Sequence, residues 1–234
     1  MNDQLDQAFE ALNTYDWGQD TKLLQPIEAA IIASHGNDPE RKQLETRLAA
    51  VLGSDAPYDA KQYACRKLRV IGSPSSVPAL AALLTDAKLS HMARFALERM
   101  PAKQAGDALR DALAKVGGDL RIGMITSLGV RGEADSVGPL QKLLGDKDAA
   151  TVRAAAYALA EIGTPEASNA LAGAKPTDAT ETAIADASLA CAEKLLAQGN
   201  KTAALKTYKR LLSDQPTKLV RLAATRGMLA CTGK

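Results

Sequence analysis

The residue types that most often carry catalysis are scarce in this chain and do not cluster. It has two histidines, His35 and His91, and neither lies at zinc-ligand spacing with another ligand. The three cysteines are odd in number and widely spaced, so Cys65, Cys191 and Cys231 are expected to be free, mostly buried thiols. The sequence contains no nucleophile motif, phosphate-binding loop or dinucleotide fingerprint. It therefore predicts no catalytic residue, no metal site and no cofactor.

One short polar group has a spacing that suits recognition. Ser90, His91 and Arg94 lie within one turn of an expected helix, so their side chains would project together. Helix capping and hydrogen bonding between repeats is the first interpretation of these residues. A polar recognition spot is the alternative, and these three residues are its candidates.

Composition indicates that the elements that position such groups are helices. Aromatic residues make up only 3% of the chain, and the apolar volume comes from Ala and Leu, the strongest helix formers. The formal charge is +2, which is too balanced for a basic stripe, and aromatic stacking residues are few. Nucleic-acid binding is therefore not expected.

The sequence also bears on the compartment. No stretch of about 18 apolar residues occurs, so no membrane span is expected. The first residues, Met-Asn-Asp-Gln-Leu-Asp, are acidic and lack the apolar core of a signal peptide. The chain as written is expected in the cytoplasm, or to be exported if a signal peptide has been removed.

A repeat of about 30 residues runs through the middle of the chain. Its turn anchors, Gly72, Pro101, Gly132 and Gly163, are 29, 31 and 31 residues apart. Positions at fixed distances from each anchor are apolar. Four residues before the anchors these are Leu68, Leu97, Leu128 and Leu159; eight before, Ala64, Ala93, Met124 and Ala155; eight after, Leu80, Leu109, Leu140 and Leu171; and twelve after the first three anchors, Leu84, Leu113 and Leu144.

This spacing predicts two amphipathic helices in each repeat. Residues four apart lie on one face of a helix, and the glycine or proline between the two stripes ends the first helix. Neither helix can bury its stripe alone, so each hairpin must stack on the next and share a continuous core. The predicted fold class is all-α, a solenoid of stacked helical hairpins.

The last of these repeats resembles a known family. The stretch DAATVRAAAYALAEIGTPEA, from Asp148 to Ala167, is similar to a HEAT repeat of the short bacterial kind, which is also seen in phycobilin lyases. The resemblance implies a right-handed α-α superhelix of the HEAT or armadillo-like type, and it does not imply bilin chemistry. Enzymes of the deoxyhypusine hydroxylase type build a di-iron site on this scaffold from repeated His-Glu pairs, and neither histidine of this chain precedes a glutamate.

The whole chain, residues 1–234, is expected to form a single α-solenoid domain. Residues 1–56 are predicted to be capping helices, at 3–14, 21–34 and 39–52, and residues 57–175 to be four HEAT-like repeats. Residues 176–234 are predicted to be irregular helices, with a hairpin similar to a HEAT or tetratricopeptide unit and a last helix at 216–230.

The N-terminal cap departs from the repeat pattern. Glu45 stands eight residues before Gly53, where the repeats have a small or flexible apolar residue. Tyr15 and Trp17 lie at the hinge between the first two expected helices and are predicted to pack there. An exposed contact with a partner is the alternative, because both residue types are common in binding hot spots.

Function is predicted from the surface that the second helices of the repeats would form. They would line the concave side of a solenoid, and their polar residues mix both signs of charge, which favours a protein or peptide partner. The candidates for that contact are Lys103, Asp107, Arg110, Gln141 and Lys142. The expected function is a non-catalytic scaffold or adaptor; the alternatives are a phycobilin-lyase-type or other small-ligand enzyme, or the helical arm of a larger enzyme.

Overall fold

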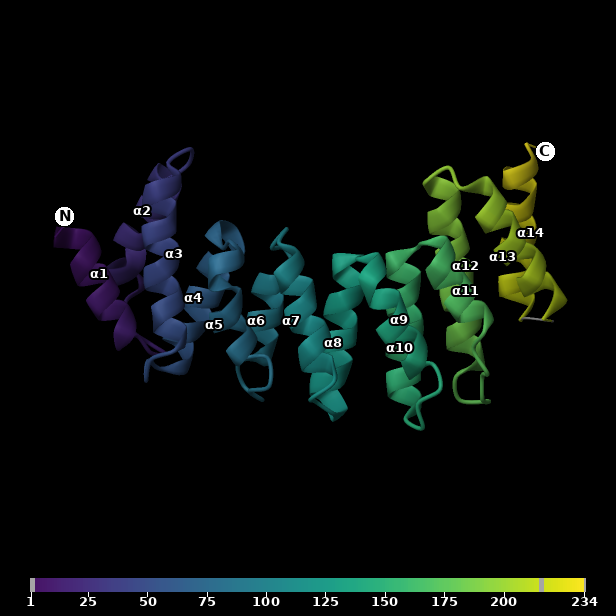
Figure 1. The fold of residues 1–234 in the computed structure, drawn as a ribbon, viewed down its shortest axis with the longest axis horizontal. Helices are drawn as coiled ribbons and strands as arrows, with labels where there is room; N and C mark the ends of the chain where they lie inside the picture. Colours follow the sequence, from purple (N-terminus) through teal and green to yellow (C-terminus); the bar gives the residue numbers. More distant parts are fainter. Residues whose placement is uncertain (1–2, 215–216, 234) are drawn as a thin grey trace. The chain divides into compact units, whose positions relative to one another are not determined.

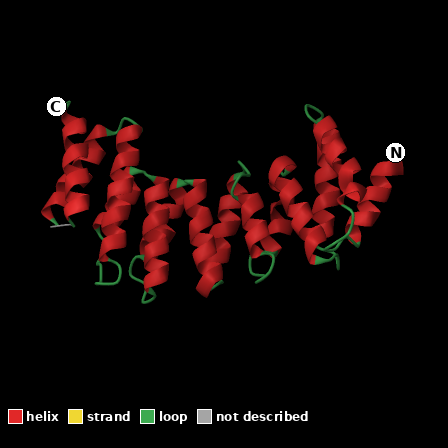
Figure 2. Ribbon diagram, turned by 180° about the vertical axis from the view of Figure 1, so that it is seen from behind, coloured by secondary structure: helices red, strands yellow, loops and turns green. Residues whose placement is uncertain are grey.

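The structure is a computed structural model that describes residues 3–214 and 217–233. Those residues form helices and loops and contain no β-strand, as Figure 2 shows. The helices fall into two compact units, Met1–Val116 and Gly117–Lys234. The predicted all-α class is confirmed, and the single-domain organisation stays a prediction.

The first unit contains the N-terminal helices and two helical hairpins (Figure 1). Within it, α4 packs against α3 and α6, while α5 packs against α7. Corresponding helices of successive hairpins therefore lie together. The elements are α1 (Asp3–Asn13), η1 (Thr21–Leu24), α2 (Gln25–Ala33), α3 (Asp38–Leu52), α4 (Tyr58–Ile71), η2 (Pro74–Ser76), α5 (Val77–Ala82), α6 (Ser90–Leu97) and α7 (Lys103–Leu113).

The second unit repeats this arrangement with longer helices. One row consists of α8, α10 and α12, and a second row of α9, α11 and α13; α14 then packs on α12 and α13 (Figure 1). The elements are α8 (Gly118–Arg131), η3 (Ala134–Ser136), α9 (Val137–Leu143), α10 (Ala149–Ile162), α11 (Pro165–Ala172), α12 (Glu181–Ala197), α13 (Lys201–Ser213) and α14 (Lys218–Thr232). The predicted last helix starts at Pro216, which lies outside the described residues.

The apolar positions predicted from the repeat form the core of each unit. The four leucines that precede the anchors are fully buried, and so are the small or flexible residues one turn earlier. The leucines eight residues after the anchors are buried as well. Each buried leucine contributes about 1.5–3 kcal/mol of hydrophobic stabilisation. The prediction of leucine-sealed hairpins is confirmed in both units.

The turn anchors end their helices in two different ways. Gly132 and Gly163 take the left-handed conformation, with φ of 68° and 64°, as predicted for a glycine just after a helix. Gly72 is extended instead, with φ −63° and ψ 144°. A Cβ atom there would lie 2.4 Å from the Leu68 carbonyl oxygen and 2.6 Å from Met100 Cε. Gly72 is thus needed for close packing rather than for a positive φ.

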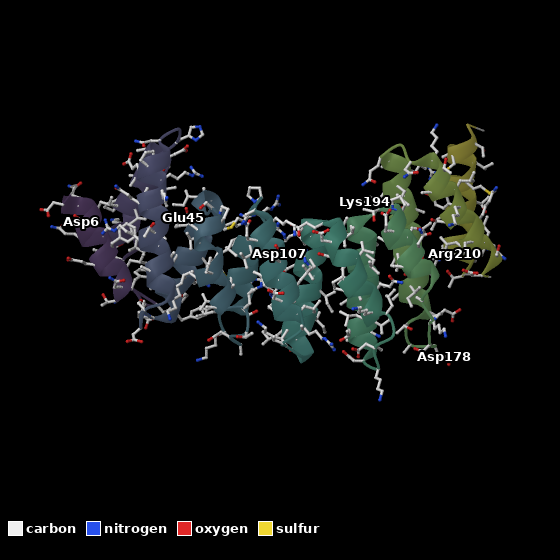
Figure 3. The ribbon with its side chains drawn as sticks, in the orientation of Figure 1. Asp6, Glu45, Asp107, Asp178, Lys194 and Arg210 are labelled. Carbon is white, nitrogen blue, oxygen red and sulfur yellow. The ribbon has the colours of Figure 1, made fainter. Side chains whose placement is uncertain are left out.

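Two further glycines show how closely neighbouring helices of the second unit approach. A Cβ atom on Gly129 of α8 would lie 2.8 Å from Ala158 Cα of α10, so the two backbones touch at that point. A Cβ atom on Gly163 would lie 2.5 Å from Cδ of Lys194, whose amino group donates a hydrogen bond to the Glu161 carbonyl oxygen. The stem of Lys194 therefore covers the end of α10 (Figure 3).

Glu45, which breaks the apolar pattern, is buried and fully hydrogen-bonded. Its Oε1 accepts from the backbone N–H groups of Ser73 at 2.7 Å and Ser76 at 3.1 Å, and its Oε2 accepts from Ser73 Oγ at 2.8 Å. The carboxylate of α3 (Figure 3) thus caps η2, the start of the next repeat's second helix. This residue explains why the cap departs from the repeat pattern.

The prediction that Trp17 packs inside the N-terminal cap is wrong. Its side chain is 89% exposed, on the loop between α1 and η1. Tyr15 is partly covered and lines a surface pocket with Leu24 and Tyr63. The buried apolar side chains of this cap are instead those of residues such as Leu12, Leu24 and Ile27.

Candidate functional site

The predicted polar spot on α6 is divided between core and surface. Ser90 is buried, and its Oγ has no hydrogen-bond partner among the described residues. His91 is exposed and its Nδ1 lies 3.4 Å from Nη2 of Arg94. Burial lowers the pKa of the Arg94 guanidinium. The three residues therefore do not project together, because Ser90 occupies a core-facing position at the start of α6.

Three of the predicted contact residues meet on α7. Asp107 accepts hydrogen bonds from Arg110 Nη2 at 2.5 Å and from Lys103 Nζ at 3.2 Å (Figure 3). These hydrogen bonds, that of Arg110 first, lower the pKa of Asp107 below its ordinary value. The three side chains satisfy one another as i, i+3 and i, i+4 neighbours. Their role in binding stays a prediction.

The other two predicted contact residues lie in the second unit. Gln141 and Lys142 are exposed neighbours on α9. Neither side chain forms a hydrogen bond or ion pair with the described residues. Both side chains can therefore contact a ligand at the surface. Their binding to a polypeptide partner stays a prediction.

Asp148 and Arg153, at the start of α10, have separate hydrogen-bond partners. Asp148 caps α10 by accepting from the N–H groups of Ala150 and Thr151 and from Thr151 Oγ1. Arg153 donates instead to the Ala179 carbonyl oxygen at 3.3 Å. The nearby N–H groups satisfy the carboxylate locally, as expected for an aspartate before a helix.

Among the described side chains, no set of three or more His, Cys, Asp or Glu residues is close enough to hold a metal ion. In the same residues, no helix is both long and apolar enough to cross a bilayer.

The second unit has a cavity of about 560 Å³ among α11, α12 and α13. Its walls combine apolar side chains with hydroxyl and charged groups. The apolar walls come from Leu171, Ala172, Ala174, Pro176, Ile184, Ala185 and Leu211; the polar groups are Glu181, Thr182, Ser188, Arg210, Asp214 and Thr217. The wall is therefore about half polar, and a concave site that combines apolar walls with placed polar groups can bind a small ligand.

Arg210, labelled in Figure 3, is the cation among the residues that line this cavity. Its Nη2 donates to Oγ of the buried Ser188 at 3.1 Å, and its Nε lies 3.9 Å from Asp214 Oδ2. Nε is buried and has no hydrogen-bond partner among the described residues. Only 25% of the side chain is exposed, and this burial lowers the pKa of the guanidinium. The lowered pKa means that Arg210 has lost hydration, which an anionic ligand would replace.

This cavity was missed in the sequence, although one signal pointed to it. The anchor spacing lengthens to 36 residues between Gly163 and Gly199, behind the loop at residues 173–180. Three residues of this loop and its flanks, Ala172, Ala174 and Pro176, line the cavity. Ser188 and Arg210 are 22 positions apart and meet only through the packing of α12 on α13.

Comparison with known proteins now defines the class. The family model of HEAT repeats matches residues 106–192. The predicted resemblance to HEAT repeats is confirmed over that stretch, and the described residues form stacked helical hairpins. No curated protein matches the chain.

A solved structure is similar over almost the whole length. It is human deoxyhypusine hydroxylase in complex with glycerol, with 16% identity, a TM-score of 0.40, and coverage of 99% of this chain and 96% of that one. The finding contradicts the prediction of a non-catalytic scaffold, because the similar protein is an enzyme. One fold hosts many functions, so a search for short motifs does not exclude catalytic groups.

Proposed function

We propose that this chain acts as a small-ligand enzyme and that its ligand binds in the cavity among α11, α12 and α13. This takes up the small-ligand alternative raised by the sequence. The observation that supports it is Arg210, a cation in the cavity wall whose buried Nε lacks a hydrogen-bond partner among the described residues.

The cavity offers distinct surfaces to a small organic anion. Arg210 can donate hydrogen bonds to a carboxylate, and charge-assisted hydrogen bonds of this kind are the strong ones. Leu171, Ile184 and Leu211 offer apolar contact to the body of the ligand. Asp214, which is 62% exposed, adds a carboxylate to the polar part of the wall.

Binding is tested with 4-methylpentanoate, a carboxylate with a branched apolar body, by ligand-observed NMR and calorimetry. We expect saturable binding that weakens at least tenfold in Arg210→Gln, since a charge-assisted hydrogen bond contributes about 1.5–3 kcal/mol. Arg221→Gln is the matched control, because Arg221 is exposed on α14 in the same unit. No binding to the native chain, or equal binding by Arg210→Gln, overturns the proposed site.

Catalysis is tested separately from binding. The chain is incubated with a defined mixture of carboxylic and amino acids, and NMR follows each compound over hours. We expect one compound to be converted by the native chain and by Arg221→Gln but not by Arg210→Gln. Biliverdin absorbance is recorded in parallel as the test of the lyase alternative. If no compound is converted, the enzymatic part of the proposal is overturned.

A further inference from the structure

We infer that the ligand of the α11–α13 cavity is a zwitterion, a small molecule with a carboxylate and an ammonium group on an apolar body. This inference rests on the ligand site proposed above. It follows from the charges in the cavity wall and from the depth at which each charge lies.

The first step is the sign of the charges. The side chains that line the cavity include one cation, Arg210, and two carboxylates, Glu181 and Asp214, and all the others are uncharged. A simple anion would satisfy Arg210 but would face two negative charges. A simple cation would satisfy the carboxylates and leave the buried guanidinium without an anionic ligand. A phosphate, with nearly two negative charges, fits least well.

The second step is that the opposite charges in the wall pair only weakly. Nε of Arg210 on α13 lies 3.9 Å from Oδ2 of Asp214, the residue just after this helix, which is ion-pair distance but beyond hydrogen-bond distance. Asp214 is mostly exposed, and its pairing with Arg210 is therefore weak. Both groups remain able to bind opposite charges of one ligand.

The third step is the order of the polar groups from inside to outside. Ser188 is buried and holds Nη2 of Arg210, so the guanidinium is fixed at the deep side of the polar wall. Glu181, the first residue of α12, and Asp214, just after α13, are both exposed. A ligand would therefore place its carboxylate inward on Arg210 and its ammonium group outward between water and these carboxylates. Its apolar body would lie against Leu171.

Three probes with related branched apolar bodies separate the possibilities. L-leucine carries both charges, 4-methylpentanoate only the carboxylate and 3-methylbutan-1-amine only the ammonium group. By calorimetry on the native chain, we expect L-leucine to bind at least tenfold more tightly than either of the others. The double variant Asp214→Asn, Glu181→Gln should bind L-leucine about tenfold more weakly. It should bind 4-methylpentanoate as tightly as the native chain does, or more tightly.

Controls distinguish recognition from loss of fold. Glu166→Gln, an exposed carboxylate of α11, should leave all three affinities unchanged. Arg210→Lys keeps the positive charge but loses the forked geometry of the guanidinium. This variant should therefore bind L-leucine and 4-methylpentanoate, but more weakly than the native chain does. Thermal unfolding of each variant, followed by circular dichroism, shows whether the second unit is still folded.

Two outcomes overturn the inference in different ways. If 4-methylpentanoate binds as tightly as L-leucine, the zwitterion is wrong and the proposed ligand site stands. If none of the three probes binds the native chain, both the inference and the ligand site are overturned. Equal loss of L-leucine and 4-methylpentanoate binding in the Asp214 and Glu181 variant also contradicts the assigned roles.

Discussion

Replacing Glu45 by alanine should destabilise the first unit more than any exposed substitution on the same helix. The carboxylate accepts hydrogen bonds from two backbone N–H groups and one hydroxyl at the junction between α3 and η2. Alanine removes all three acceptor contacts at once. It also leaves the N–H group of the buried Ser76 without this partner.

The magnitude follows from the contacts. A hydrogen bond to a charged group contributes about 1.5–3 kcal/mol, and three that share one carboxylate are not additive. Ser73 is partly exposed, so water can replace part of what it loses. We therefore expect a loss of about 3 kcal/mol in the free energy of unfolding. Glu45→Gln keeps one oxygen for the N–H groups but loses the charge, so its expected loss is about 1 kcal/mol.

The assay is equilibrium urea unfolding followed by circular dichroism at about 222 nm, the helical signal. Gln43→Ala is the matched control, since Gln43 is exposed in the middle of the same helix. It should change the free energy of unfolding by less than about 0.5 kcal/mol. If Glu45→Ala falls within that range of Gln43→Ala, the capping role assigned to this carboxylate is refuted.

Three further predictions concern packing, pH and thiol reactivity. Gly129→Val should cost about 2–3 kcal/mol, because its side chain would overlap the α10 backbone. The pKa of Asp86 is lowered by hydrogen bonds from backbone N–H groups, that of Leu89 first. The ionised Asp86 therefore stabilises the folded state at pH values above its unfolded-state pKa of about 4. This contribution to stability is lost as the pH falls through the lower folded-state pKa. Iodoacetamide at about pH 8 should alkylate partly exposed Cys231 quickly and, before unfolding, spare the two buried thiols, Cys65 and Cys191.

Each of these has a direct check. Gly138→Ala is the control for Gly129→Val, because a Cβ atom at Gly138 meets nothing within 4 Å; a similar loss for both would contradict the close-approach argument. Melting temperatures between pH 3 and 6 should depend less on pH for Asp86→Asn than for the native chain. Burial raises the pKa of Cys65 to about 12 and that of Cys191 to about 11, so mass spectrometry that finds three equally fast thiols would contradict their burial.

The helical hairpins could be predicted from the sequence because their cause is local. The leucines four residues before each anchor fall on one face whatever the neighbouring helices do, and Gly132 and Gly163 end their helices through their own backbone freedom. Helix propensity, stripe spacing and turn residues agreed in each repeat. The buried positions of each hairpin can therefore be predicted without knowledge of the contacts between helices.

The features that sequence reasoning missed depend on contacts between distant positions. Glu45 looks like a break in the pattern until the Ser73 turn, 28 positions later, meets it. Arg210 and Ser188 meet through the packing of two helices after an irregular loop. Trp17 is predicted to pack at the hinge between two helices, but no periodicity marks the loop where it lies exposed. Spacing along one helix carries none of this information.

The rows of helices have a mechanical consequence. Within the second unit, α10 is bound mainly to α8 before it and α12 after it, so each contact surface joins neighbours in the chain. Pulled from one end, such an array would release its hairpins one after another at low force, and each would find its own neighbours again when the tension falls. The second unit would then behave as an extensible spring whose stiffness is set by contacts between neighbouring hairpins.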